Sequence, residues 1–318
     1  MDTGTPATRN RTITLTDTER SELRPQLLDT ERLKAGHPWE DTIIWGDALD
    51  ALSILPDACA HLIIADPPYN ITRRYGSTPF RALNRQAYKA FLQSWLPALC
   101  RKLRKDGSLY LCGDWHNSAQ LQEVLEQELT ILNRITWQRE KGRGAQRNWK
   151  NSMEDIWFAV KDTRDYHFNL NAVKTRRIVR APYRENGLPK DWQQQPDGTM
   201  VRETCPSNFW DDISIPFWSM PENTPHPTQK PEKLIAKLIL ASSREGDLVL
   251  DPFMGSGTTA VVAKKLGRRF CCIEREEEYC LMAAKRLRIA DCDKSIQGYT
   301  NGIFWERNSL PLQRKKKP

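Results

Sequence analysis

Short apolar runs alternate with helical patterns along most of this chain of 318 residues. Short apolar runs bounded by turn residues are typical of buried strands, and apolar positions three or four apart are typical of helices. Strands that alternate with helices predict an α/β fold with a doubly wound, mostly parallel sheet. The expected strands are 42–45, 61–65, 107–112, 130–137, 156–160, 247–250 and 269–273, and the expected helices are 48–55, 85–103, 117–129 and 258–266.

Two stretches depart from this alternation. Residues 1–38 are polar and have no sustained apolar period, which predicts a loosely ordered N-terminal arm. Residues 162–224 are rich in Gln, Asn, Pro and charge, which predicts an inserted substrate-reading region outside the sheet. A variable loop without a role is the alternative for this insertion. The main domain is then expected in two halves, 39–161 and 225–290, followed by an extension with a basic tail at 291–318.

Asp66-Pro67-Pro68-Tyr69 directly follows the expected strand 61–65. Ligands of open α/β sheets bind at the carboxyl ends of the strands. The two prolines stiffen the turn and remove backbone donors, which leaves it rich in carbonyl acceptors. A carboxylate, a carbonyl and an aromatic ring together suit the exocyclic amine of a flat base. The alternative is that these four residues mark only a turn.

A second motif, Asp-Pro-Phe-Met-Gly-Ser-Gly-Thr-Thr at 251–259, follows strand 247–250 and leads into helix 258–266. Its glycines allow a tight turn and a close approach of the backbone to a ligand. The next strand ends in Glu274, near the spacing at which an acid binds a ribose hydroxyl in nucleotide-binding βαβ units. The motif has no Gly-Lys-Ser/Thr, so a P-loop is not expected.

With His-Pro-Thr-Gln-Lys-Pro at 226–231, these motifs resemble those of the S-adenosylmethionine-dependent DNA amino-methyltransferases. The catalytic motif precedes the cofactor motif, and that order resembles the β class of the family. The resemblance covers roughly residues 40–290. It implies a Rossmann-like methyltransferase fold in which 39–161 is the catalytic half, 162–224 recognises the target and 225–290 binds the cofactor.

The resemblance also implies roles for individual residues. Asp66, Pro67, Pro68 and Tyr69 would hold the target amine and its base. The cofactor S-adenosyl-L-methionine would be bound by Asp47, Thr228, Lys230, Asp251, Phe253, Gly255, Ser256, Gly257, Thr258 and Glu274. In this scheme Asp251 faces the cofactor ammonium, Glu274 takes the ribose hydroxyls, and Thr228 and Lys230 line the methionine end. A helix-capping role is the alternative for Asp47 and for Thr228.

The chain carries a net charge of +8 and has a pI of about 9.1, which suits a polyanionic partner, although ordinary solubility would also explain it. Basic stretches lie on expected loops, and residues 174–184 contain no acid and show no strong helical or strand period. We expect DNA contacts from Arg73, Arg74, Lys141, Arg143, Arg147, Lys150, Arg176, Arg177 and Arg180. A solvated face is the alternative for each stretch.

The eight cysteines show neither Cys-x-x-Cys nor zinc-type spacing, so no metal site is expected and the thiols suit a reducing cytosol. Cys271 and Cys272 lie in an expected strand and are predicted to be packing residues. No apolar run approaches the length of a membrane span, and the N-terminus lacks a signal-peptide core. The sequence therefore predicts a cytoplasmic protein, prokaryotic or phage-encoded, with no membrane partner.

The activity that the resemblance implies is methylation of the N6 amine of an adenine flipped out of double-stranded DNA. The N4 amine of cytosine is the second candidate, although cytosine enzymes of the family more often carry Ser in place of Asp66. A catalytically silent DNA-binding module on the same fold is the third. A nicotinamide oxidoreductase would share the glycine turn but would not need Asp-Pro-Pro-Tyr. The resemblance admits three partners: double-stranded DNA, a restriction endonuclease acting on the same site, and a second copy of the chain.

Overall fold

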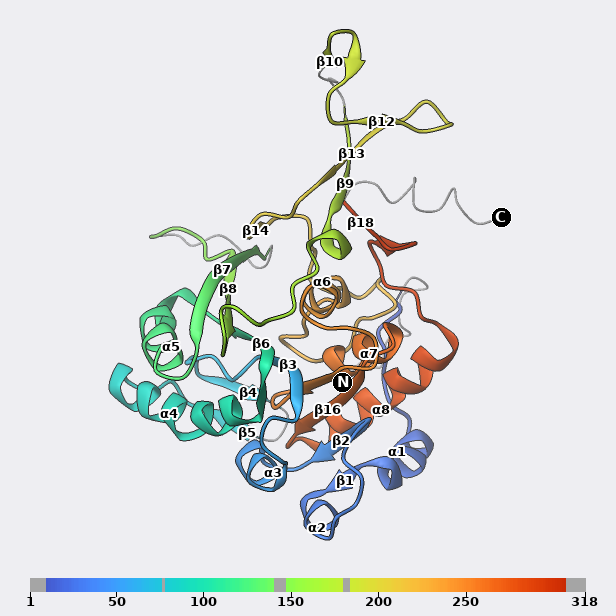
Figure 1. The fold of residues 1–318 in the computed structure, drawn as a ribbon. Coiled ribbons are helices and arrows are strands. Elements are labelled where there is room, and N and C mark those ends of the chain that lie inside the picture. Colours follow the sequence, from blue (N-terminus) through green and yellow to red (C-terminus); the bar gives the residue numbers. More distant parts are fainter. Residues whose placement is uncertain (1–9, 76–77, 140–146, 180–183, 307–318) are drawn as a thin grey trace.

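The computed structural model describes residues 10–75, 78–139, 147–179 and 184–306, and its centre is a large twisted sheet (Figure 1). Within these residues the sheet has nine strands in the order β1-β2-β16-β15-β3-β6-β8-β7-β14. All neighbours in this order are parallel except β8, which runs antiparallel to β6 and β7. Their bounds are β1 Leu28–Asp29, β2 Thr42–Trp45, β16 Arg269–Glu274, β15 Leu248–Asp251, β3 Ala60–Ala65, β6 Leu103–Gly113, β8 Met153–Val160, β7 Thr130–Gln138 and β14 Phe209–Trp210.

Helices cover both faces of this sheet, and each face has its own hydrophobic cluster. One cluster joins the sheet to α2 (Thr30–Lys34), α3 (Ala48–Ile54), α4 (Arg85–Lys102) and α5 (Ser118–Leu125). The other joins it to α1 (Asp17–Leu23), α6 (Glu232–Ser242), α7 (Thr258–Lys265) and α8 (Glu277–Cys292). This three-layer arrangement confirms the expected α/β class with a mostly parallel sheet.

Local signals set several of the predicted elements. Asn84 accepts a hydrogen bond from the backbone of Ala87 and so caps α4, whose apolar residues Trp95 and Leu99 are buried. Gly267 ends α7 in the left-handed conformation, with φ +73°. Cys271 and Cys272 are buried in β16, as predicted for packing residues.

The prediction of a loosely ordered arm is wrong for residues 10–38. Thr16 and Glu19 form a reciprocal capping box at the start of α1, and β1 extends the large sheet beside β2. The arm has few apolar residues, but Leu23, Leu27 and Leu28 are each buried against the body of the protein. Burial of single leucines gives no apolar period, and therefore the sequence pattern did not predict this structure.

The prediction that residues 162–224 lie outside the sheet needs two corrections. Strand β14 lies within this range and joins the large sheet beside β7. Most of the remainder forms a second, five-stranded sheet that projects from the body (Figure 1). Its order is β12-β13-β9-β18-β17, with bounds β12 Gln193–Gln194, β13 Met200–Thr204, β9 Thr175–Ile178, β18 Ile303–Trp305 and β17 Tyr299–Thr300.

Shorter elements complete the described chain. Two hairpins are formed by β4 (Arg73–Tyr75) with β5 (Thr78–Phe80), and by β10 (Arg184–Glu185) with β11 (Leu188–Pro189). Three 3₁₀ turns, η1, η2 and η3, lie at Arg24–Gln26, Trp115–Asn117 and Leu170–Val173. Among the described residues, no helix combines the length and the apolar character that a membrane crossing requires.

Candidate active site

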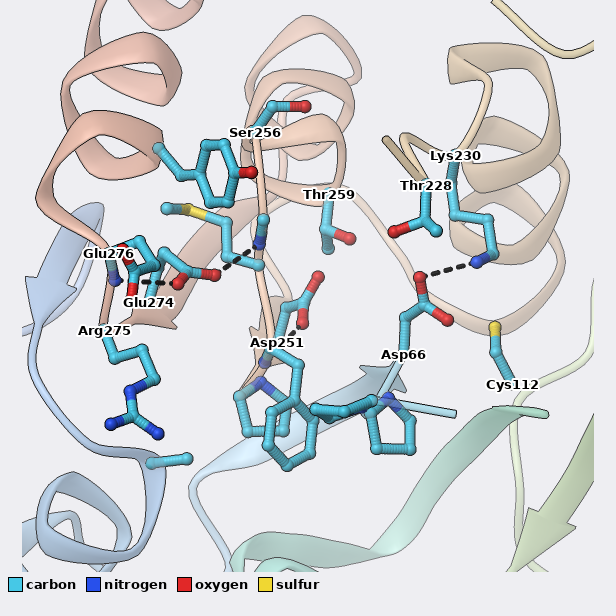
Figure 2. A pocket seen from close by; sticks show the side chains of 18 of the residues that line it. Asp66, Cys112, Thr228, Lys230, Asp251, Ser256, Thr259, Glu274, Arg275 and Glu276 are labelled. Carbon is cyan, nitrogen blue, oxygen red and sulfur yellow. Dashed lines mark hydrogen bonds and ion pairs between the residues drawn. The ribbon is translucent and has the colours of Figure 1, made fainter. Parts of the chain in front are cut away.

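A cavity of about 280 Å³ opens at the carboxyl ends of the central strands β3 and β15. These strands are hydrogen-bonded neighbours, with Ile63 opposite Leu250. The Asp-Pro-Pro-Tyr turn leaves β3 and the glycine-rich turn leaves β15, so the two motifs meet although they are far apart in the chain. Figure 2 shows Asp66 and Asp251 near each other in the cavity, with Lys230 on one side and Glu274 on the other.

The two carboxylate oxygens of Asp66 have different surroundings. Oδ2 lies 2.5 Å from Nζ of Lys230, whose side chain is only 7% exposed. Oδ1 is buried and has no hydrogen-bond partner among the described residues. One oxygen is therefore held by a cation, and the other remains an acceptor at the cavity wall.

Tyr69 is held by its hydroxyl group. This oxygen accepts a hydrogen bond from Lys230 Nζ at 3.2 Å and donates one to Oε2 of Glu154 at 3.4 Å. Burial raises the pKa of Tyr69 well above its usual value of 10, so the phenol stays protonated. The ring thus lines the cavity in a fixed orientation.

Asp251 lies at the base of the glycine-rich turn. Its Oδ1 accepts a hydrogen bond from the backbone of Phe253 at 3.0 Å, and its side chain is also hydrogen-bonded to Thr259. Burial raises the pKa of Asp251 to about 7. A bound cationic group beside this carboxyl would favour its ionised form.

Glu274 joins the glycine-rich turn to the segment after β16. Its Oε2 accepts from the backbone of Gly255 at 2.9 Å, and its Oε1 accepts from the backbone of Glu276 at 2.9 Å. Burial raises the pKa of Glu274 to about 7, although both backbone hydrogen bonds favour the charged form. The contacts of this side chain with a ribose remain a prediction.

Of the residues assigned to the base and the cofactor, only Gly257 is missing from the described cavity wall; the wall includes Asp47, Asp66, Pro67, Pro68, Tyr69, Thr228, Lys230, Asp251, Phe253, Gly255, Ser256, Thr258 and Glu274. Gly257 has φ +86°, and a Cβ there would lie 2.4 Å from Cβ of Ala283 on α8. This glycine therefore permits the close approach of α8 to the turn, not the approach of a ligand.

The capping alternatives have opposite outcomes. Asp47 accepts a hydrogen bond from the backbone of Leu49 at 2.8 Å and is the N-cap of α3, while also lining the cavity. Thr228 caps no helix, because α6 has Pro231 at its N-cap position. Lys230 was assigned to the methionine end of the cofactor, but its ammonium is bound to the catalytic motif.

Sequence analysis missed three residues of this site. Glu154 lies on β8 outside any motif, and only the antiparallel pairing of β8 with β6 brings it here. His226 and Tyr279 line the cavity, and their rings pack edge to face at 4.5 Å. Burial lowers the pKa of His226 to about 4, so its imidazole is neutral at pH 7. His226 begins the recognised 226–231 stretch and could have been assigned from that signal.

The basic residues have varied surroundings. Arg73 is exposed and donates to the carbonyl of Pro227 at 3.4 Å, near the cavity, and Arg74 lies beside it in β4. Arg147 and Lys150 are exposed. Lys141, Arg143 and Arg180 lie outside the described residues.

The prediction of an unneutralised, irregular cluster near residue 176 is wrong in the described part. Arg176 and Arg177 lie in strand β9. Arg176 pairs with Glu203 of β13 at 2.5 Å, and Arg177 pairs with Glu306 at 3.3 Å. The acids come from neighbouring segments that are distant in sequence, so the local sequence did not reveal them.

Comparison with known proteins agrees with this geometry. The model of a family described as DNA methylase, whose members modify N6 or N4 amines, matches residues 60–285. The chain belongs to the N6/N4 DNA methylase family. It is 36% identical over 250 residues to the DNA adenine methyltransferase YhdJ of Escherichia coli K12, covering 78% of this chain and 83% of that protein. It is 34% identical over 250 residues to the type II methyltransferase M.HpaI of Haemophilus parainfluenzae, covering 78% and 74%.

Solved structures of DNA methyltransferases share the fold of this family member. The cytosine-N4-specific PvuII DNA methyltransferase matches with a TM-score of 0.58 at 19% identity, over 77% of this chain and 85% of that one. A DNA modification methylase of Thermus thermophilus, solved with S-adenosyl-L-methionine, matches with a TM-score of 0.53 at 20% identity, over 84% and 98%. The chain is an S-adenosylmethionine-dependent DNA methyltransferase of this family.

The cavity suits that cofactor. Asp251 offers a buried carboxyl, and Ser256 has a buried hydroxyl oxygen with no hydrogen-bond partner among the described residues. Phe253 adds an apolar surface, which packs against Trp95 with ring centroids 4.9 Å apart. These groups match the cationic, polar and flat parts of S-adenosylmethionine.

Proposed function

We propose that this chain methylates the N6 amine of adenine in double-stranded DNA at a specific sequence. The observation that carries the proposal is the asymmetry of Asp66: Lys230 holds Oδ2, whereas the buried Oδ1 is an acceptor without a partner among the described residues. An acceptor at a cavity wall, beside the Pro67 carbonyl and the Tyr69 ring, suits an amine on a flat base.

The chemistry requires such acceptors because the adenine amine is a poor nucleophile. Its lone pair is delocalised into the ring, and two hydrogen-bond acceptors shift electron density back to the nitrogen. Oδ1 of Asp66 and the Pro67 carbonyl would accept these two hydrogens. The carboxylate would then stabilise the positive charge that develops on nitrogen, and the proton would leave to Asp66 or to water.

The cofactor supplies an electrophilic methyl group on sulfur. Asp251 would face its ammonium and Glu274 its ribose hydroxyls, while the turn 253–258 would follow its length. The raised pKa values of Asp251 and Glu274, both about 7, support this placement. Buried carboxyls that lack a cationic partner are the groups that a bound ammonium or hydroxyl would stabilise.

The target base must leave the helix to reach this cavity. Flipping costs a few kcal/mol, and stacking on the Tyr69 ring would offset part of that cost. We propose that residues 162–224 read the target sequence, and that exposed Arg73, Arg147 and Lys150 contact phosphates. Arg74, Lys141, Arg143, Arg176, Arg177 and Arg180 remain candidates for the same contacts.

Adenine is preferred over cytosine for two reasons. Asp66 heads the catalytic motif, where the resemblance associates cytosine enzymes with Ser. The relative YhdJ is named a DNA adenine methyltransferase. Because M.HpaI is named a type II methyltransferase, we also propose an endonuclease counterpart for this chain. The eight cysteines, all free, support a cytoplasmic location.

The test is expression in a host without DNA methylation, followed by sequencing with base-modification detection. The proposal predicts methyladenine within one short sequence. Modified cytosine would move the chain to the cytosine-N4 activity, and unmodified DNA would indicate a catalytically silent module.

A further inference from the structure

A buried network of two acids and two bases lies behind the catalytic motif. Lys230 Nζ contacts Asp66 Oδ2 at 2.5 Å, Tyr69 Oη at 3.2 Å and Glu154 Oε2 at 3.3 Å. An ammonium has three hydrogens, and these three oxygens match them in number. Glu154 is itself ion-paired with Arg139, which follows β7.

Glu154 stands apart from its partners in one respect. The described residues of the cavity wall include Asp66, Tyr69 and Lys230 but not Glu154. Its side chain is 3% exposed and contacts the two groups that in turn contact Asp66. Any influence of Glu154 on a substrate must therefore pass through Lys230 and Tyr69.

We propose that Glu154 is a positioning residue for methyl transfer, which fixes Lys230 and Tyr69 so that Asp66 presents Oδ1 to the target amine. The inference rests on the proposed function. Glu154 also balances charge, because the pairs Asp66–Lys230 and Glu154–Arg139 are together neutral. Without its carboxylate, one positive charge near Asp66 is uncompensated, which weakens Asp66 as an acceptor.

Other ionisable groups also face Asp66, and they titrate in every variant that keeps them. They are Cys112 on β6, His226 before α6 and Asp251 on β15. Burial raises the pKa of Cys112, lowers that of His226 to about 4 and raises that of Asp251 to about 7. Only a change relative to the wild-type pH profile therefore reports on Glu154.

The structure offers a matched control on the same strand. Asp155 is also buried, accepts a hydrogen bond from Thr136 at 2.7 Å and lies 3.8 Å from Arg134. Successive strand residues point to opposite faces, so Asp155 does not join the network. Asp155→Asn removes a buried charge of the same kind from the same strand.

The test is steady-state methyl transfer to DNA by wild type, Glu154→Gln and Asp155→Asn across pH, with cofactor affinity measured by calorimetry. For Glu154→Gln we expect kcat to fall by up to about 100-fold, the effect of a small misplacement of a reacting group. The cofactor Kd and the DNA KM stay near wild type, and the acid limb of kcat moves to lower pH. Asp155→Asn keeps the wild-type kcat and pH profile.

A double variant separates charge from shape. Arg139→Gln combined with Glu154→Gln restores neutrality, so the acid limb should return toward wild type and kcat should partly recover. Unchanged kcat and pH profile in folded Glu154→Gln, or an equal loss in Asp155→Asn, would overturn the positioning role. A wild-type enzyme that modifies only cytosine refutes the adenine proposal, yet the same variant ratios still test Glu154.

Discussion

At Asp66 the side chain has one oxygen committed to Lys230 and one oxygen available to a ligand. The sequence motif predicted the residue and its position at the end of a strand, because both follow from local pattern. It did not predict the asymmetry, because Lys230 comes from a segment 164 residues away. Local patterns identify reactive groups, whereas the partners that orient them depend on the tertiary fold.

Asp66→Ala should lower kcat by about 100- to 1,000-fold or more, because it removes the acceptor that stabilises charge on the target amine. The S-adenosylmethionine affinity should stay near wild type, as measured by calorimetry. Asp66→Asn should also fail, because an amide can place a donor where an acceptor is needed. Near-normal turnover of either folded variant would refute the mechanism.

Gly257→Ala should lower the stability of the whole protein, since it adds a Cβ 2.4 Å from that of Ala283 in a backbone at φ +86°. The expected loss is about 1–3 kcal/mol from overpacking, in addition to the backbone cost. Gly36→Ala is the control, because Gly36 has φ +83° but nothing within 4 Å of an added Cβ. Equal melting temperatures for the two variants would contradict the packing role of Gly257.

Strand β9 illustrates what the sequence could predict at the scale of elements. The strands and helices of the large sheet carry apolar periods, and their predicted positions agree with the structure to within a few residues. Strand β9 is short and basic, and its neighbours β13 and β18 come from distant parts of the chain. Its stability depends on those long-range pairs, such as Arg176 with Glu203, so its local pattern carried no signal.

The arginines of different elements should therefore respond differently to salt. Arg147→Ala should reduce the slope of log affinity for DNA against log salt by about 0.9, the value for one phosphate neutralised by one arginine. Arg176→Ala should leave the slope nearly unchanged and lower the melting temperature, because Arg176 pairs with Glu203 and lies 5.7 Å from the Trp305 ring. Fluorescence titrations at several salt concentrations give the slopes. The opposite pattern would show that β9 faces the phosphates.

Across the whole molecule, the sheet that projects from the body is tied to the catalytic half through α6. Lys233 Nζ donates to the carbonyl of Trp305 and to Asp212, each at 2.6 Å. Helix α6 begins two positions after Lys230, which holds Asp66. The C-terminal strand β18 is thus part of the same framework as the active site, although the sequence pattern predicted a separate extension there.

The stability of the cofactor-free protein should depend on pH in a definite direction. Burial raises the pKa of Asp251 from 3.8 to about 7, so the folded state holds a proton that the unfolded state has released between pH 4 and 7. Stability from this group is full below about pH 4 and is lost as the pH rises through 7. Melting temperature should therefore fall across this range, and less so in Asp251→Asn. The stabilisation by S-adenosylmethionine should grow over the same range; an identical dependence in Asp251→Asn would contradict this assignment.

The most direct test of the account is nucleoside mass spectrometry of unmethylated DNA after incubation with S-adenosylmethionine and either wild-type protein or Asp66→Ala. The two proteins should first be shown to bind the cofactor equally. The account predicts N6-methyladenine with wild type and a loss of at least about 100-fold with Asp66→Ala. Only N4-methylcytosine with wild type, or equal amounts of N6-methyladenine with both proteins, would contradict it.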